Sequence, residues 1–159
     1  MPESKGRKSG IMKRIIVKEE WCLGCRLCEY YCTFACSGEE DIVKALKDKK
    51  IDANVTVEGM REKAEGKSSI TFAVSCRHCK NPLCITGCIS GALSKDPEGA
   101  VRIDKNLCVA CGSCVMLCPY GAIRITDDGA ASKCELCMGN SCGKPLCVAK
   151  CPNAAIVLE

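Results

Sequence analysis

Residues 108–119 read CVACGSCVMLCP, a run in which four cysteines have the spacing Cys-x2-Cys-x2-Cys-x3-Cys. The same spacing begins again at Cys22. Two further blocks, which begin at Cys76 and Cys134, keep the first Cys-x2-Cys pair and the final Cys-x3-Cys pair but lengthen the gap between the pairs. Sixteen of the eighteen cysteines fall into these four blocks: Cys22, Cys25, Cys28 and Cys32; Cys76, Cys79, Cys84 and Cys88; Cys108, Cys111, Cys114 and Cys118; and Cys134, Cys137, Cys147 and Cys151.

The blocks are repeats of one sequence unit. The residues that follow the final cysteine are versions of one hexapeptide: CISGAL at 88–93, CPYGAI at 118–123 and CPNAAI at 151–156. Pro-Leu-Cys precedes the last pair in both lengthened blocks, at 82–84 and at 145–147. This match selects Cys147, rather than Cys142, as the third cysteine of the fourth block. Such self-similarity indicates one small module that is used several times.

The cysteine spacing predicts iron–sulfur chemistry. In bacterial ferredoxins, three thiolates of one tight run hold a [4Fe–4S] cluster and the fourth cysteine ligates a different cluster. Four blocks therefore predict four [4Fe–4S] clusters and one-electron transfer. Disulfides are disfavoured because no apolar signal segment follows the basic residues 1–14. Structural zinc is the remaining alternative, yet zinc sites usually combine two Cys-x2-Cys pairs, or one pair with histidines, and the chain has one histidine.

Composition narrows the possible functions further. Only 4% of the residues are aromatic, so the core should be small and bound clusters should supply much of the folding energy. The formal charge is +4, but four clusters with their thiolates would bring it to about −4, and nucleic-acid binding is not expected. No apolar run approaches the ~20 residues of a membrane span. We expect a cytoplasmic protein with no membrane anchor.

The pattern of β-branched and apolar residues predicts an α+β fold. Short strands are expected at 14–17, 70–74, 101–103, 123–125 and 156–158. A short helix is expected before the final cysteine of each block. Residues 39–47 predict an amphipathic helix with acids at its start and bases at its end, and the charged stretch 49–67 is expected to be a surface loop.

At the four cysteine blocks, the chain resembles the four-cluster ferredoxin-type electron-transfer subunits. These include the iron–sulfur subunits of dimethyl sulfoxide reductase, formate dehydrogenase and hydrogenase complexes and the ferredoxin-like partner of carbon monoxide dehydrogenase. The resemblance implies two intertwined bacterial two-cluster ferredoxin modules, one inserted in the other. The outer module would comprise 11–36 plus 131–159, the inner module would comprise 70–130, and 37–69 would be an insertion that carries the amphipathic helix.

The resemblance also implies which cysteines share a cluster, because it pairs the first block with the fourth and the second with the third. The implied ligand sets are Cys22, Cys25, Cys28 and Cys151; Cys32, Cys134, Cys137 and Cys147; Cys76, Cys79, Cys84 and Cys118; and Cys88, Cys108, Cys111 and Cys114. Cys36 and Cys142 are left over and are expected to be spare thiols, with alternative ligation of the neighbouring cluster left open. His78 is expected to lie at the surface or to form hydrogen bonds rather than to bind iron.

We therefore expect a non-catalytic electron-transfer subunit in a hetero-oligomer. It would connect a catalytic redox subunit to a second redox partner, which we expect to be a flavoprotein. Carbon monoxide dehydrogenase with a flavin/NAD oxidoreductase is the first choice for this pair. The alternatives are a molybdenum or tungsten oxidoreductase, a hydrogenase, or a freely diffusing polyferredoxin, and a zinc-loaded interaction module is the most remote. The chain has no Gly-x-Gly-x-x-Gly motif, so no nucleotide cofactor site is predicted.

Overall fold

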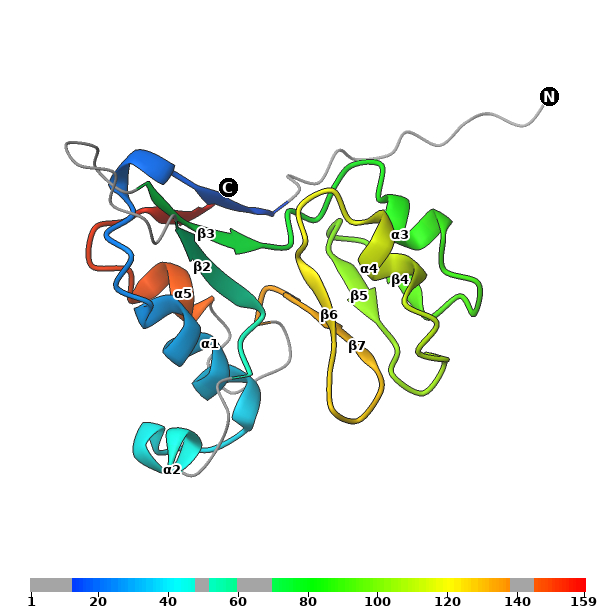
Figure 1. Ribbon diagram of the computed structural model, residues 1–159, viewed down its shortest axis with the longest axis horizontal. Helices are drawn as coiled ribbons and strands as arrows, with labels where there is room; N and C mark the ends of the chain where they lie inside the picture. The colour runs from blue at the N-terminus through cyan, green and yellow to red at the C-terminus, as the bar shows by residue number, and fades with distance from the viewer. Residues whose placement is uncertain (1–12, 48–51, 60–69, 138–144) are drawn as a thin grey trace.

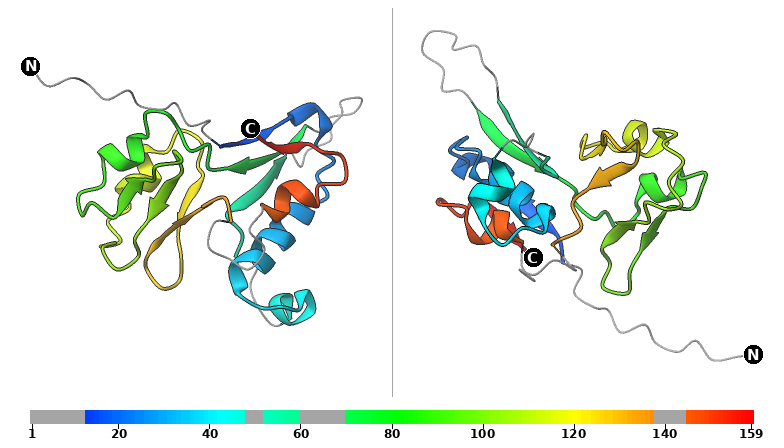
Figure 2. Two further views of the ribbon diagram at one scale, coloured as in Figure 1. Left: turned by 180° about the vertical axis from the view of Figure 1, so that it is seen from behind. Right: turned by 90° about the horizontal axis from the view of Figure 1, so that it is seen from below.

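The computed structural model describes residues 13–47, 52–59, 70–137 and 145–159. Figure 1 shows that the described elements gather in two lobes. One, called here the terminal lobe, holds β1, α1, α2, β2, β3, α5 and β8; the other, the central lobe, holds α3, β4, β5, α4, β6 and β7. The lobes also remain distinct in the two views of Figure 2. The first and last described elements therefore share one lobe, and the middle of the sequence builds the other.

Every sheet in the described part of the chain has two antiparallel strands. The pairs are β1 (Ile15–Val17) with β8 (Ile156–Leu158), β2 (Val55–Gly59) with β3 (Thr71–Ser75), β4 (Leu93–Lys95) with β5 (Val101–Ile103), and β6 (Ile123–Ile125) with β7 (Ala131–Lys133). The first pair joins segments from opposite ends of the sequence. Because an isolated two-stranded sheet is marginally stable in water, these sheets depend on what packs against them.

Helices begin at equivalent places in the four cysteine blocks. They are α1 (Leu27–Ser37), α3 (Leu83–Thr86), α4 (Ser113–Leu117) and α5 (Leu146–Ala149). Two further elements lie outside the blocks: the short 3-10 helix η1 (Glu19–Trp21) and α2 (Ile42–Leu46). In each of the four, the third cysteine of the block is the second helical residue. Helix α1 packs against α5, and α3 packs against α4. The sequence prediction of a short helix before each final cysteine is confirmed.

Most of the predicted elements are present, with one error. All five predicted strands form, and α2 forms inside the predicted helix 39–47, where the Asp41 carboxylate caps it by accepting from the N–H of Val43 at 2.7 Å. The prediction of a surface loop over 49–67 is wrong for β2, because Val55 and Val57 are 3% and 5% exposed. The N–H of Val57 also donates to the buried Glu29 carboxylate on α1, at 2.6 Å.

Two groups of buried residues form the cores. The larger group, mainly in the terminal lobe, consists of Ile15, Cys28, Cys32, Val55, Val57, Ala73, Cys76, Ala100, Cys134, Leu136, Cys147 and Ile156. The smaller, in the central lobe, consists of Leu93, Val101, Cys114, Ile123 and Ala131. Cysteines of the four blocks belong to both cores, so several of the predicted cluster ligands are also core residues. None of the described helices is long and apolar enough to cross a bilayer.

Candidate iron–sulfur cluster sites

Three cavities of nearly equal size are each lined by four cysteines. Their volumes, which include space open to solvent, are about 340, 340 and 350 Å³. The lining sets are Cys22, Cys25, Cys28 and Cys151; Cys88, Cys108, Cys111 and Cys114; and Cys76, Cys79, Cys84 and Cys118. Each cavity thus brings three cysteines of one block together with the last cysteine of another. These are three of the four sets that the sequence resemblance implies, and iron binding by them stays a prediction.

The fourth cavity is larger and more open, at about 1150 Å³. Its cysteines are Cys32, Cys36, Cys134 and Cys137. Cys147 is not part of its wall but is buried in the same core group as Cys32 and Cys134. Cys142 lies outside the described residues. Within the described ranges, no group of three or more histidine, cysteine or carboxylate side chains is placed to hold a single metal ion.

The loops around the cavities share an unusual backbone conformation. In the first Cys-x2-Cys pair of every block, the residue before the second cysteine has a left-handed φ: Gly24 at 66°, His78 at 45°, Ala110 at 55° and Leu136 at 58°. For a residue with a side chain, this conformation costs roughly 1–2 kcal/mol. Turns that mix right- and left-handed residues point successive N–H groups into a concavity suited to anions, including iron–sulfur sites. Strain repeated at equivalent positions indicates that the loops are shaped by what they enclose.

Residue Ala110 offers a test of this loop strain. It is exposed and has a φ of 55°, so a substitution changes the backbone preference without disturbing the core. A β-branched residue is a clear outlier at positive φ. We expect Ala110→Val to lower the free energy of unfolding of the iron-loaded protein by about 1–3 kcal/mol and to reduce its iron content, with Ala110→Gly tolerated. Thermal denaturation and iron analysis measure both effects. Equal losses in the exposed neighbour variant Val109→Ile would contradict this account.

Comparison with known proteins identifies the family to which these cysteine-lined cavities belong. Residues 67–159, which hold the second, third and fourth cysteine blocks, match the family described as 4Fe-4S dicluster domain. The chain belongs to the 4Fe-4S dicluster domain family. Membership in this dicluster family makes iron–sulfur clusters, rather than zinc, the group for which the cysteines are arranged.

Curated relatives of this chain extend the match to the first block. An iron-sulfur protein of Rhodospirillum rubrum is 34% identical over 157 residues, covering 89% of this chain and 79% of the relative. The electron transport protein HydN of Escherichia coli K12 is 29% identical over 163 residues, covering 92% and 87%. The B subunit of the anaerobic dimethyl sulfoxide reductase of the same organism is 30% identical over 141 residues, covering 85% and 67%. By name, these are iron–sulfur, electron-transport or reductase proteins.

The sulfurs of the four final cysteines have hydrogen-bond donors, and these donors differ from site to site. Where proline follows the cysteine, the donor lies four residues later: Ala122 donates to Cys118 at 3.5 Å, and Ala155 donates to Cys151 at 3.3 Å. Where proline is missing, further donors take part: Cys88 has the Ser90 hydroxyl at 3.7 Å as well as backbone N–H groups that include Ala92, and the N–H of Asn54 donates to Cys32 at 3.2 Å. Hydrogen bonds to sulfur tune the reduction potentials of clusters, so the four sites should not be equivalent.

Burial disfavours the thiolate form of these cysteines unless a nearby positive charge stabilises it. It raises the pKa of Cys28 to about 11 and that of Cys134 to about 12. The pKa of Cys147 is raised by burial and then by the neighbouring Cys134 and Cys137. These thiols are protonated at neutral pH in the iron-free chain. Because iron binds thiolates, loading must release their protons, and the iron charge must replace the lost solvation.

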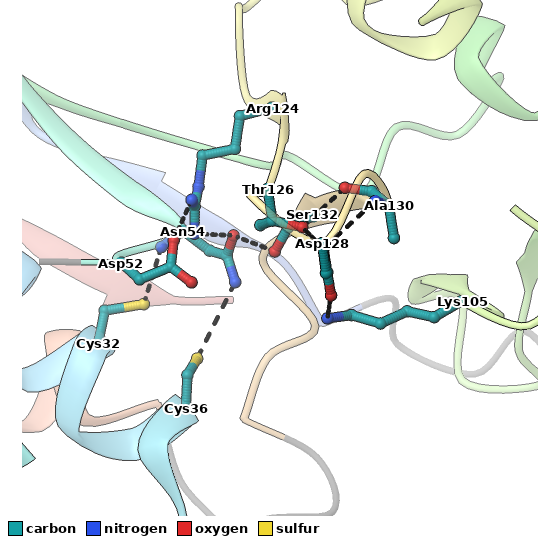
Figure 3. Close-up of polar contacts among 10 residues, drawn as sticks. All are labelled: Cys32, Cys36, Asp52, Asn54, Lys105, Arg124, Thr126, Asp128, Ala130 and Ser132. Atoms are coloured by element: carbon teal, nitrogen blue, oxygen red, sulfur yellow. Dashed lines mark hydrogen bonds and ion pairs between the residues drawn. The ribbon is translucent and has the colours of Figure 1, made fainter. Parts of the chain in front are cut away.

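A polar network joins the wall of the fourth cavity to the central lobe (Figure 3). Asn54 donates from its side chain towards the Cys36 sulfur at 3.9 Å and accepts from the hydroxyl of Ser132 at 2.9 Å. Arg124 donates to the same Asn54 oxygen at 3.3 Å and pairs with Asp52. Strands β6 and β7 are thereby tied to the segment that precedes β2. The network places Cys36 on the cavity wall, and its status as a spare thiol stays a prediction.

Cys36 interacts directly with a predicted ligand. It lies one helical turn after Cys32 on α1, and the hydrogen bond between the two sulfurs raises the pKa of Cys32 and lowers that of Cys36. The sequence gives no sign of this pairing beyond the four-residue separation, which places both residues on one helix face. Cys36 is therefore the described residue best placed to replace a ligand of the fourth site.

His78 is not at the surface. It is completely buried, and its Nδ1 accepts a hydrogen bond of 2.9 Å from the N–H of Val101 on β5. Of the two roles considered from the sequence, the hydrogen-bonding one is therefore the correct one. Burial, reinforced by the nearby Lys133 charge, lowers the pKa of His78 to about 3, so the imidazole is neutral. With Nδ1 accepting, the proton of the neutral ring lies on Nε2.

Proposed function

We propose that this chain is a non-catalytic electron-transfer subunit that holds four [4Fe–4S] clusters and connects a catalytic redox subunit to a second redox partner in the cytoplasm. Bound clusters would supply one-electron oxidation and reduction. The observation that carries the proposal is that three cavities of equal size are each lined by four cysteines from two different blocks. The fourth cluster would be held by Cys32, Cys134, Cys137 and Cys147.

The ligand sets imply that the protein consists of two modules. The outer module would comprise 11–36 plus 131–159 and the inner module 70–130, with 37–69 between them. Three packing features support this arrangement: β1 pairs with β8, α1 packs on α5, and α3 packs on α4. In each case the partners come from the two cysteine blocks, or their flanks, that would share a pair of clusters.

Two of the four sites are placed to exchange electrons with partners. Cys25 and Cys111 are exposed, and they line different cavities, one in each lobe. Each is flanked by an exposed apolar side chain, Leu23 at 67% and Val109 at 60% exposure. None of the proposed ligands of the other two sites is exposed. Electrons would enter at one exposed site, pass through the two middle sites and leave at the other.

The proposed catalytic partner is carbon monoxide dehydrogenase, with a flavin/NAD oxidoreductase as the second partner. The similarity to a protein named as the B subunit of an anaerobic dimethyl sulfoxide reductase favours an alternative, in which the catalytic subunit is an oxidoreductase of that class. Both possibilities give this chain the same role, because its described residues offer electron-transfer sites at two separated surfaces.

A reconstituted relay tests this role. The iron-loaded chain, mixed anaerobically with purified carbon monoxide dehydrogenase, carbon monoxide and an FAD-containing oxidoreductase, should accelerate flavin reduction severalfold over the mixture without it. The iron-free chain is the matched control. The loaded chain alone should oxidise no carbon monoxide.

The outcomes separate the alternatives. Acceleration only when a purified dimethyl sulfoxide reductase catalytic subunit replaces the dehydrogenase would select the second partner class. Substrate turnover by the isolated chain, persisting after removal of trace enzymes, would refute the non-catalytic role. A loaded chain that associates with no redox enzyme would support a freely diffusing polyferredoxin instead.

A further inference from the structure

The ammonium group of Lys133 is buried, and no carboxylate in the described part of the chain forms an ion pair with it. Lys133 ends β7 and is 2% exposed. Its Nζ donates to the carbonyl oxygen of Cys134 at 2.8 Å and to that of Val101. None of the ion pairs among the described residues involves it. Because an unpaired buried charge is strongly unfavourable, an anion is expected near this group in the functional protein.

Lys133 lies between two of the cysteine-lined cavities. It forms part of the wall of the fourth cavity, beside Cys134. Val101, which accepts one of its hydrogen bonds, lines the cavity of Cys76, Cys79, Cys84 and Cys118. These are the two middle sites of the proposed electron path. The Lys133 ammonium therefore lies between the two sites through which an electron would pass from one lobe to the other.

The backbone of Val101 helps to hold this cation in position. Its N–H donates to His78 at 2.9 Å, and its carbonyl accepts from Lys133. The two side chains come from the loops of the two middle sites, so the backbone of one residue, Val101, is bonded to both loops. His78 is thus a positioning residue for the charge.

The nearby thiols respond to the charge of Lys133. Burial raises the pKa of Cys76 and of Cys134, and the Lys133 ammonium opposes the rise at both thiols. It has the same opposing effect at Cys84, whose pKa is also raised mainly by burial. Lys133 therefore acts electrostatically on ligands of both middle sites.

We propose that Lys133 is the shared counter-ion of the two middle clusters and raises both reduction potentials, so that these clusters are reduced before the two terminal ones. The inference rests on the proposed function, because it requires clusters in these cavities. Reduction adds a negative charge, and a nearby cation in a poorly solvated site stabilises the more negative state. Net charge around a cluster is one of the features that set its potential.

Redox titration followed by electron paramagnetic resonance tests the proposal on the iron-loaded protein. Lys133→Met and Lys133→Gln remove the charge, and the second keeps a hydrogen-bond donor. We expect two of the four clusters to become at least tenfold harder to reduce, a shift of about 59 mV for a one-electron couple. Lys133→Arg, which keeps the charge, should stay near wild type.

A second lysine provides the matched control. Lys95 donates to the carbonyls of Cys79 and Lys80 at 2.8 and 3.1 Å, but it is only partly buried, so solvent screens its charge. Lys95→Met should shift the nearby cluster less than Lys133→Met. Unshifted potentials in Lys133→Met and Lys133→Gln, with iron content intact, would overturn the counter-ion role.

The wild-type protein gives a readout that needs no variant. If the middle clusters are reduced first, a half-reduced sample should display spin-coupled signals, because the two reduced clusters are neighbours. Uncoupled signals at half reduction would overturn the inference even if every Lys133 variant failed to hold iron. A wild-type chain that binds no iron would instead refute the proposed function.

Discussion

Removal of iron from the loaded protein should unfold it. In the larger core, five of the twelve buried residues are cysteines, so much of that core is built from the predicted ligands. The described sheets have only two strands each, and α2, α3, α4 and α5 have five residues or fewer. Neither kind of element is stable alone. A structural metal site contributes on the order of 10 kcal/mol, comparable to the whole net stability of a typical domain.

The experiment combines iron analysis with circular dichroism. The loaded protein should contain about sixteen irons per chain, four in each cluster, with matching sulfide. Anaerobic chelation should abolish the cooperative thermal transition, and iron with sulfide should restore it. A cooperative transition of the iron-free chain, or restoration by zinc alone, would contradict the expectation.

The sequence was sufficient for the repeat and for most of the elements built on it. The Pro-Leu-Cys match between 82–84 and 145–147 selects Cys147, which the structure buries in the core. Strands that flank the blocks were predictable because their β-branched runs are bounded by turn residues. Strand β2 was not, because its alternation spans only Val55–Gly59 and lies within a strongly charged stretch.

The finer features of the sites depend on tertiary structure. Left-handed backbone is usually signalled by glycine, and Gly24 fits that rule, but Ala110 and Leu136 occupy the same conformation without a sequence signal. Lysine is rarely buried, so composition alone would place Lys133 at the surface. Its burial follows from its position directly before Cys134, which is itself buried in the larger core.

Substitution of Cys151 should remove a cluster whose other ligands lie at the opposite end of the sequence. Cys151 lines one cavity with Cys22, Cys25 and Cys28, and the pairing of β1 with β8 brings these distant segments together. In Cys151→Ser we expect iron to fall by about a quarter, since one cluster in four is lost. Electron transfer through the exposed site at Cys25 should fall with it, because the path then lacks its terminal member.

Alkylation of thiols shows which cluster is lost. Under anaerobic conditions, cysteines that bind iron are protected from iodoacetamide, and peptide mass mapping identifies those that react. Cys22, Cys25 and Cys28 should become reactive in Cys151→Ser, and Cys134 and Cys137 should stay protected. Cys118→Ser, the equivalent change in the central lobe, should instead expose Cys76, Cys79 and Cys84. Cys36→Ala, which changes a wall residue outside the ligand sets, should leave the iron content unchanged.

The opposite protection pattern would exclude this ligand arrangement. If Cys151 bound the same cluster as Cys134 and Cys137, each block would hold its own cluster, as in a string of independent sites. We expect the shared arrangement instead, because Cys151 lines one cavity with Cys22, Cys25 and Cys28. Sharing between distant blocks would also explain how β1 and β8, which are only three residues long, stay paired, because the cluster would join the same two segments.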